Sequence, residues 1–118
     1  MLRKITMVAI RVADFPRCVA WYRDVLGLQP VGLHDDPFCL MLLPEGETAF
    51  ALDGTNPVLG GSNCMANVLV ESLAETVSEL RSKGVRFARE VQADDDEGYA
   101  IATIEDCEGN LINLYENR

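Results

Sequence analysis

The hydrophobic and polar positions of this chain follow two periods in turn. A period of two, typical of strands, covers residues 5–12, and a period near 3.6, typical of helices, follows it. The apolar residues of the helical stretch are Phe15, Cys18, Val19, Tyr22, Val25 and Leu26. Asp14 is the predicted N-cap of this helix and Gly27 its predicted end. Three shorter stretches predict strands at residues 29–33, 38–43 and 48–52.

The same order of elements then begins again. Residues 64–70 alternate as a strand, and Ser72 with Glu75 forms a capping box for a second helix that Gly84 ends. Further strands are predicted at residues 85–89, 98–104 and 111–115. The chain therefore contains the unit βαβββ twice. We expect one domain over 1–118, with module one at about 1–54, a Gly- and Pro-rich linker at about 55–62 and module two at about 63–118.

The turn and strand that begin at Asp106 carry the strongest local signal. The Asp106 carboxylate can accept hydrogen bonds from its own turn, and Gly109 allows the chain to reverse tightly. In the strand that follows, Leu111, Asn113 and Tyr115 share one face. A polar Asn113 between apolar neighbours indicates either a lined site or an edge strand with one wet face.

Charge and composition narrow the classes of function. The chain has 118 residues and a net charge of −9, from 19 acidic and 10 basic residues, which argues against nucleic-acid and anionic-membrane partners. No apolar stretch approaches the length of a membrane span, and no signal-peptide pattern precedes the first strand, so a cytoplasmic protein is expected. The four cysteines and the single histidine show no zinc-binding spacing.

Three sequence motifs carry a resemblance to a known family. They are VAIRVAD at 8–14, WYRDVLGL at 21–28 and DCEGNLI at 106–112, where Cys107 stands in place of the usual proline. With the repeat, they make the chain similar to the vicinal-oxygen-chelate superfamily, which includes glyoxalase I, extradiol dioxygenases and bleomycin-resistance proteins. The resemblance implies an α+β fold of two βαβββ modules, with curved mixed sheets paired around a cleft and helices on the outer faces. It also implies a homodimer.

The resemblance further implies where metal ligands of the family's enzymes would fall. Those positions are occupied by Met7, Phe50, Met65 and Asn113. A thioether and a neutral amide are poor ligands for the hard or borderline divalent cations, and a phenyl ring is none. We therefore expect no metal and no other cofactor. The turn at 34–36, with His34 followed by two aspartates, is the other conceivable metal cluster, although we expect a solvated hairpin loop there.

The residues expected to line the cleft are mostly apolar with a few polar groups, as in small-molecule sites. The candidate ligand-binding residues are Met7, Arg11, Phe50, Leu52, Met65, Asn67, Asn113 and Tyr115. Arg11 could bind an anionic group of the ligand. The alternative is that these side chains pack a closed core or a dimer interface. The two asparagines favour a pocket, because buried amides need hydrogen-bond partners.

Two functions follow, and no catalytic residue is assigned. The first is a metal-independent protein, not an enzyme, that sequesters a hydrophobic or aromatic small molecule. The alternative is a metal-dependent lyase or dioxygenase whose ligands are displaced to His34, Asp53 or Glu116. A structural module whose cleft is filled by its own side chains is a third possibility.

Overall fold

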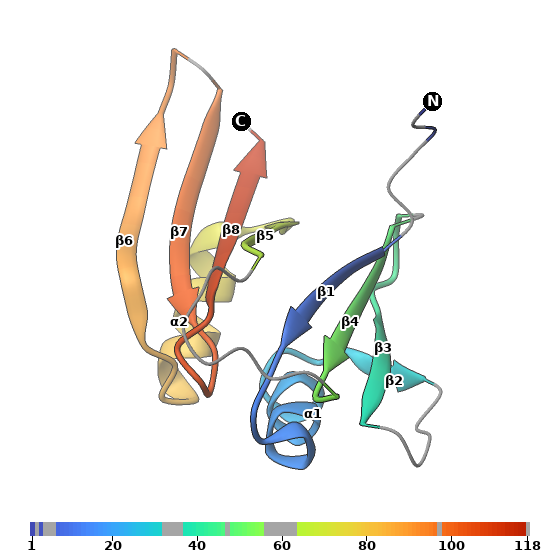
Figure 1. The fold of residues 1–118 in the computed structure, drawn as a ribbon. Coiled ribbons are helices and arrows are strands. Elements are labelled where there is room, and N and C mark those ends of the chain that lie inside the picture. The colour runs from blue at the N-terminus through green and yellow to red at the C-terminus, as the bar shows by residue number, and fades with distance from the viewer. Residues whose placement is uncertain are drawn as a thin grey trace. The chain divides into compact units, whose positions relative to one another are not determined.

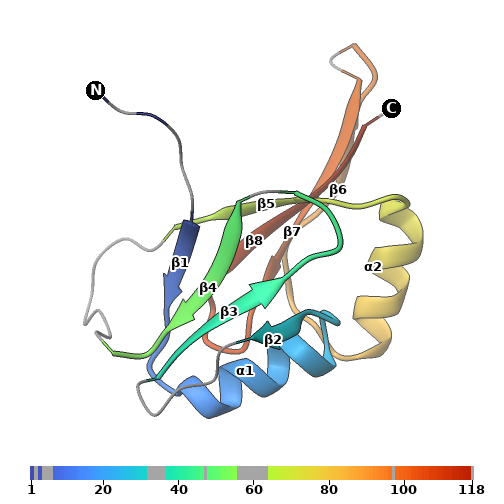
Figure 2. The ribbon, with the colours of Figure 1, turned by 90° about the vertical axis from the view of Figure 1, so that its right-hand side faces the viewer.

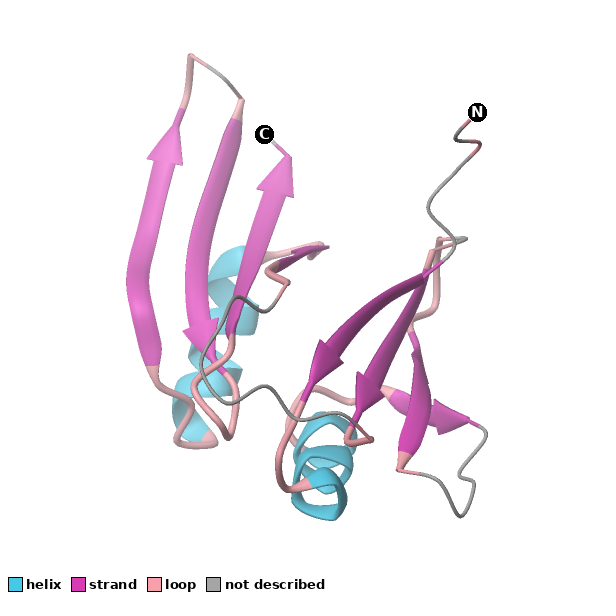
Figure 3. Ribbon diagram, in the orientation of Figure 1, coloured by secondary structure: helices cyan, strands magenta, loops and turns pink. Residues whose placement is uncertain are grey.

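The computed structural model describes residues 1, 3, 7–31, 37–46, 48–55, 64–96 and 98–117. The chain divides into two compact units, Met1–Cys64 and Met65–Arg118, called module one and module two below. Figure 1 labels their elements, and Figure 3 shows that each combines one helix with a small sheet. The turn at 34–36 and most of the predicted linker lie outside the described residues.

Module one contains a four-stranded mixed sheet and one helix. Its elements are β1 (Met7–Arg11), α1 (Phe15–Asp24), β2 (Gln29–Val31), β3 (Phe38–Leu42) and β4 (Ala49–Asp53). The strand order is β1-β4-β3-β2, in which β1 runs parallel to β4 and the other pairs are antiparallel. Figure 2 shows α1 beside this sheet.

Module two repeats this topology. Its elements are β5 (Ala66–Leu69), α2 (Leu73–Ser82), β6 (Phe87–Asp94), β7 (Tyr99–Glu105) and β8 (Leu111–Asn117). The order β5-β8-β7-β6, with β5 parallel to β8, corresponds strand by strand to that of module one. The prediction of an α+β fold built from two βαβββ modules is confirmed.

Both helices begin where the sequence predicts and α2 ends before Gly84 as predicted, whereas α1 ends at Asp24, earlier than the predicted end at Gly27. The Asp14 carboxylate accepts a hydrogen bond from the Arg17 amide at 3.3 Å, and the Ser72 hydroxyl accepts one from the Glu75 amide at 3.3 Å. Both side chains thus satisfy a backbone N–H that the helix itself leaves free. After α2 the chain turns at Gly84, whose φ of 78° is a backbone conformation that favours glycine.

The helix of module one covers one face of its sheet. The Tyr22 ring is fully buried and lies 5.7 Å, centroid to centroid, from the Phe50 ring of β4. The other side chains on this helix face are also buried: Ile10, Cys39, Met41 and Leu52. Because side chains alternate along a strand, their neighbours point to the opposite side of the sheet, called the open face below.

The helix of module two is packed in the same way. Its apolar side chains and those on the helix face of β7 and β8 are buried: Leu73, Val77, Leu80, Ala102, Ile104, Ile112 and Leu114. In addition, the Leu73 amide donates a hydrogen bond to Glu116 Oε1 at 3.0 Å. A carboxylate of β8 therefore holds the first turn of α2, where the helix dipole favours a negative charge.

We predict that Glu116→Gln lowers the free energy of unfolding by about 1 kcal/mol, because the hydrogen bond to Leu73 loses its charge. Glu71→Gln is the matched control, since Glu71 is exposed and also precedes α2. Urea denaturation of both variants measures the difference. Equal losses would mean that the general negative charge near the helix, rather than the Glu116 hydrogen bond, provides the stabilisation.

The last three strands differ from the prediction mainly in length. β6 continues to Asp94, although a strand ending at Arg89 is predicted, and β8 continues to Asn117. The pairing of β6 with β7 shifts register twice, between Phe87 and Arg89 and again between Arg89 and Gln92. Such bulges break the period of two on which the prediction depends.

The four cysteines are free thiols. Cys18 and Cys39 are buried, and burial raises the pKa of the Cys39 thiol above its ordinary value. The Cys39 Sγ donates to the Val31 carbonyl at 3.6 Å. Across the described ranges, no helix has the length and apolar character needed to cross a membrane.

Candidate functional site

The open face of module two carries a row of polar side chains across three strands. Asn67 of β5 is paired with Asn113 of β8, and Asn113 is paired with Thr103 of β7. The open-face side chains around this row are mostly apolar or aromatic: Met65, Leu69, Tyr99, Ile101, Leu111 and Tyr115. The charged residues Glu105 and Arg89 also lie on this face. An amide row inside an apolar surface is the pattern that the sequence indicated at Asn113.

Hydrogen bonds join this row into one network, called the amide row below. The Thr103 hydroxyl donates to Asn113 Oδ1 at 2.6 Å. The Asn113 Nδ2 donates to Asn67 Oδ1 at 2.9 Å and lies 3.1 Å from Met65 Sδ. Thr103 is buried, whereas Asn67 is exposed. The network therefore runs from the interior of the sheet to its surface.

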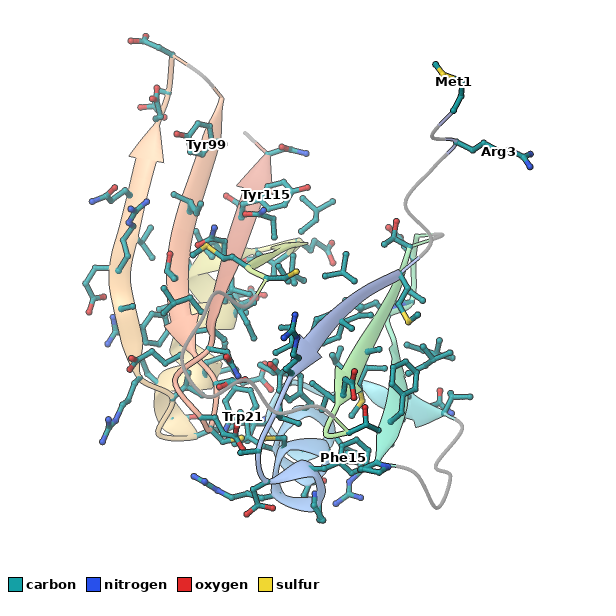
Figure 4. The ribbon with its side chains drawn as sticks, viewed as in Figure 1. Met1, Arg3, Phe15, Trp21, Tyr99 and Tyr115 are labelled. Atoms are coloured by element: carbon teal, nitrogen blue, oxygen red, sulfur yellow. The ribbon has the colours of Figure 1, made fainter. Side chains whose placement is uncertain are left out.

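Large apolar side chains surround the amide row and remain exposed within module two. Met65 is 48% exposed and Leu69 is 51% exposed. Figure 4 places Tyr99 on β7 and Tyr115 on β8, both in the upper half of the sheet. Exposed apolar surface that is contiguous with ordered polar groups is typical of a binding surface.

The open face of module one is less polar. Met7 is 44% exposed, and Ala9 is paired with Ala51 at the centre of the face. At the end of the same row, Arg11 is paired with Asp53. Opposite charges directly across two strands attract each other, so the Asp53 carboxylate competes with any anionic ligand group for Arg11.

Two candidate ligand-binding residues lie on the other side of the sheet. The prediction that Phe50 and Leu52 share a face with Met7 and Arg11 is wrong. In the observed register Phe50 is paired with Val8 and Leu52 with Ile10, on the helix face. Phe50 contacts Tyr22 of α1, and Leu52 has 0% of its surface exposed.

The error comes from one residue in a turn. Phe50 becomes the counterpart of Asn113 when the turn glycines Gly46 and Gly109 are aligned, and both glycines do have positive φ, at 104° and 83°. The register nevertheless makes Ala51, paired with Ala9, the counterpart of Asn113, which is paired with Asn67. Ala51 is five residues after its turn glycine and Asn113 is four after its own, and a shift of one residue reverses the face.

The four positions where the family's enzymes would hold a metal therefore carry Met7, Ala51, Met65 and Asn113. This set does not fit a divalent cation, because it offers two thioethers, a methyl group and one neutral amide. The Asn113 amide is also engaged, since it accepts from Thr103 and donates to Asn67.

The displaced ligands of the alternative function are His34, Asp53 and Glu116. Glu116 lies on the helix face, where it accepts from the Leu73 amide. Asp53 accepts from the Thr55 amide at 2.8 Å. His34 lies outside the described residues. Within the ranges that the structure describes, no three His, Cys, Asp or Glu side chains are grouped as metal ligands.

Of the predicted site residues, the structure brings Met65, Asn67, Asn113 and Tyr115 together on one face. Met7 and Arg11 share the open face of module one. The sequence prediction missed Thr103. Its signal was a polar residue between Ala102 and Ile104 in an otherwise apolar strand, the same kind of signal that identified Asn113.

The two βαβββ modules define the class of fold. Comparison with known proteins identifies the family. The model of the Glyoxalase/Bleomycin resistance protein/Dioxygenase superfamily matches residues 4–114. The chain therefore belongs to this superfamily. No curated protein sequence matches the chain.

Solved structures of the same fold come from several bacteria. A superfamily member from Sphaerobacter thermophilus DSM 20745 is 21% identical, with 98% of each chain covered and a TM-score of 0.78. TnmS3, an antibiotic binding protein from Streptomyces sp. CB03234, is 13% identical, with 99% of this chain and 98% of that chain covered and a TM-score of 0.84. TioX from Micromonospora sp. ML1 is 17% identical, with 99% and 97% covered and a TM-score of 0.76. At these identities the likeness shows the fold alone.

Proposed function

We propose that the protein binds a hydrophobic or aromatic small molecule on the open face of module two without a metal ion. The observation that carries this proposal is the amide row, one member of which, Asn113, stands at a position where the resemblance to the superfamily's enzymes implies a metal ligand. A hydrogen-bonded network among exposed apolar side chains suits a ligand with a large apolar surface and a few polar atoms.

In the proposed site on module two, Asn67 and Asn113 supply hydrogen-bonding groups, while Met65 and Tyr115 supply contact area. Met7 offers apolar surface on the open face of module one. Methionine is flexible and polarizable, so it adapts to irregular ligands. On the open face of module one, Arg11 is a weaker candidate for binding an anionic group, because Asp53 is paired with it. Phe50 and Leu52 would support the sheet from behind and not touch the ligand.

The superfamily context supports the same proposal. One neighbour of this fold is described as an antibiotic binding protein. In this chain, the exposed side chains of Met65 and Leu69 offer apolar contact area for a small molecule. We also propose that the protein works as a homodimer in the cytoplasm and has no nucleic-acid partner, in keeping with its net charge of −9. Light scattering on the eluting peak of a gel-filtration column tests the dimer.

We predict that ligand binding does not depend on a metal. Protein purified without chelators should contain far less than one equivalent of Zn, Ni, Mn or Fe by elemental analysis, because the four positions lack imidazole and carboxylate groups. A panel of hydrophobic and aromatic compounds, screened by thermal shift, should give hits that are unchanged by EDTA.

Two results would contradict this proposal in different ways. The alternative is a metal-dependent lyase or dioxygenase. It would be favoured by a stoichiometric metal whose removal with EDTA also abolishes an enzymatic activity. A panel without any thermal shift, in protein that contains no metal, would argue against small-molecule binding itself.

A further inference from the structure

The hydrogen bonds of the amide row all point in one direction. Thr103 donates to Asn113, and Asn113 donates to Asn67, so the donors follow each other from β7 to β5. The last member, Asn67, uses its carbonyl oxygen as the acceptor. Its own Nδ2 group carries two further N–H donors, and none of the described residues accepts from it.

Met65 fixes this direction. Its sulfur lies 3.1 Å from Asn113 Nδ2, and a thioether can accept a hydrogen bond but cannot donate one. If the Asn113 amide were reversed, its carbonyl oxygen would face the sulfur and gain nothing. The N–H groups of Asn113 must therefore face Met65 and Asn67, which in turn forces the Asn67 carbonyl inward and the Asn67 N–H groups outward.

The surroundings of Asn67 select a neutral partner. Its open-face neighbours on β5 and β8 are Met65, Leu69, Leu111 and Tyr115, none of which is a cation. Among the described residues of module two, the open-face cation nearest to Asn67 is Arg89, which is paired with Thr103 on β6, three strands away from β5. At about 4.8 Å per strand this is a separation of about 14 Å.

We infer that Asn67 donates a hydrogen bond to a neutral carbonyl-type oxygen of the ligand, such as that of an aromatic ketone, quinone or lactone. This inference rests on the proposed function and names the chemistry that its site selects. The aligned donors behind Asn67 polarise its amide and strengthen the bond to the ligand. The apolar neighbours would contact the ring system that carries the oxygen.

Three probes with the same tricyclic skeleton test the inference: fluorene, 9-fluorenone and fluorene-9-carboxylate. They offer no acceptor, a neutral carbonyl oxygen and an anionic acceptor, respectively. Each is held at a fixed low concentration while the protein is titrated, and Kd is obtained from the change in probe absorbance or fluorescence. We expect fluorenone to bind about fivefold more tightly than fluorene, although it is less hydrophobic, and the carboxylate to bind more weakly than both.

Asn67→Asp removes the donor with little change of shape, so the preference for fluorenone over fluorene should disappear while the Kd of fluorene changes less than about twofold. Gln92→Glu is the control, since it makes the same amide-to-carboxylate change at an exposed position of β6.

Thr103→Val breaks the first hydrogen bond of the amide row. It should reduce the preference for fluorenone over fluorene about twofold, although Thr103 does not contact the ligand. Circular dichroism verifies that each variant is folded.

The outcomes separate this inference from the proposed function. A preference for fluorenone that Asn67→Asp abolishes and Gln92→Glu preserves supports it. Equal binding of fluorene and fluorenone, or tighter binding of the carboxylate, overturns the inference and leaves small-molecule binding in place. Failure of all three probes to bind overturns the inference and also counts against a site for flat aromatic ligands.

Discussion

Replacing Leu52 with alanine is expected to lower the free energy of unfolding by about 3 kcal/mol, because a fully buried leucine leaves a cavity between β4 and α1. Leu42→Ala is the matched control. Leu42 is 45% exposed at the end of β3, so its truncation should cost less than about 1 kcal/mol. Urea denaturation followed by the fluorescence of Trp21, which meets the Tyr22 ring edge-on at 5.2 Å, reports on this module.

The same variant decides whether Leu52 belongs to the ligand site. Since Leu52 faces the helix, Leu52→Ala should leave the Kd of a bound small molecule nearly unchanged under conditions where the variant is folded. A small loss of stability combined with a large loss of binding would show that Leu52 lies on the open face, and it would refute the register that pairs Leu52 with Ile10.

Removing the Asp106 carboxylate should have the second large effect. Asp106 is only 6% exposed, and its Oδ1 accepts from the amides of Glu108 and Asn110, each at 2.8 Å. Its Oδ2 accepts from Asn110 Nδ2 at 2.9 Å. Asp106→Ala leaves these donors without their partner, and we expect a loss of about 3 kcal/mol in the free energy of unfolding.

Asp106→Asn serves as the comparison for this turn. It keeps one oxygen for the backbone amides but loses the charge and the bond from Asn110 Nδ2, so a loss of about 1 kcal/mol is expected. Because the turn sets the start of β8, Asp106→Ala should also weaken ligand binding through Asn113. A loss of stability below about 0.5 kcal/mol for Asp106→Ala would mean that Gly109 alone maintains the turn.

The turn and last strand of the second module could be predicted from the sequence, and the reason is local. Asp106, Gly109 and the alternating residues after them determine both the turn and the face that each side chain of β8 takes. Asn113 was found because an amide between Leu111 and Tyr115 breaks an apolar pattern. Its network could not be predicted, since it depends on strands that are distant in the sequence.

The first module shows where such reasoning fails. The equivalence of two turn glycines suggested Phe50 as the counterpart of Asn113, but the strand after Gly46 begins one residue later. Composition could not reveal the error, because Phe50, Ala51 and Leu52 are all apolar and suit either face. Register is specified by pairing with β1 and by the packing of α1, neither of which a local pattern contains.

Along β8, the even-numbered and the odd-numbered residues have different roles. Ile112, Leu114 and Glu116 hold α2, while Leu111, Asn113 and Tyr115 form part of the open face. Substitutions at odd positions can thus change what the face recognises while the contacts with α2 persist. A chain built in this way can acquire a new ligand by mutation of alternate residues, without first losing its fold.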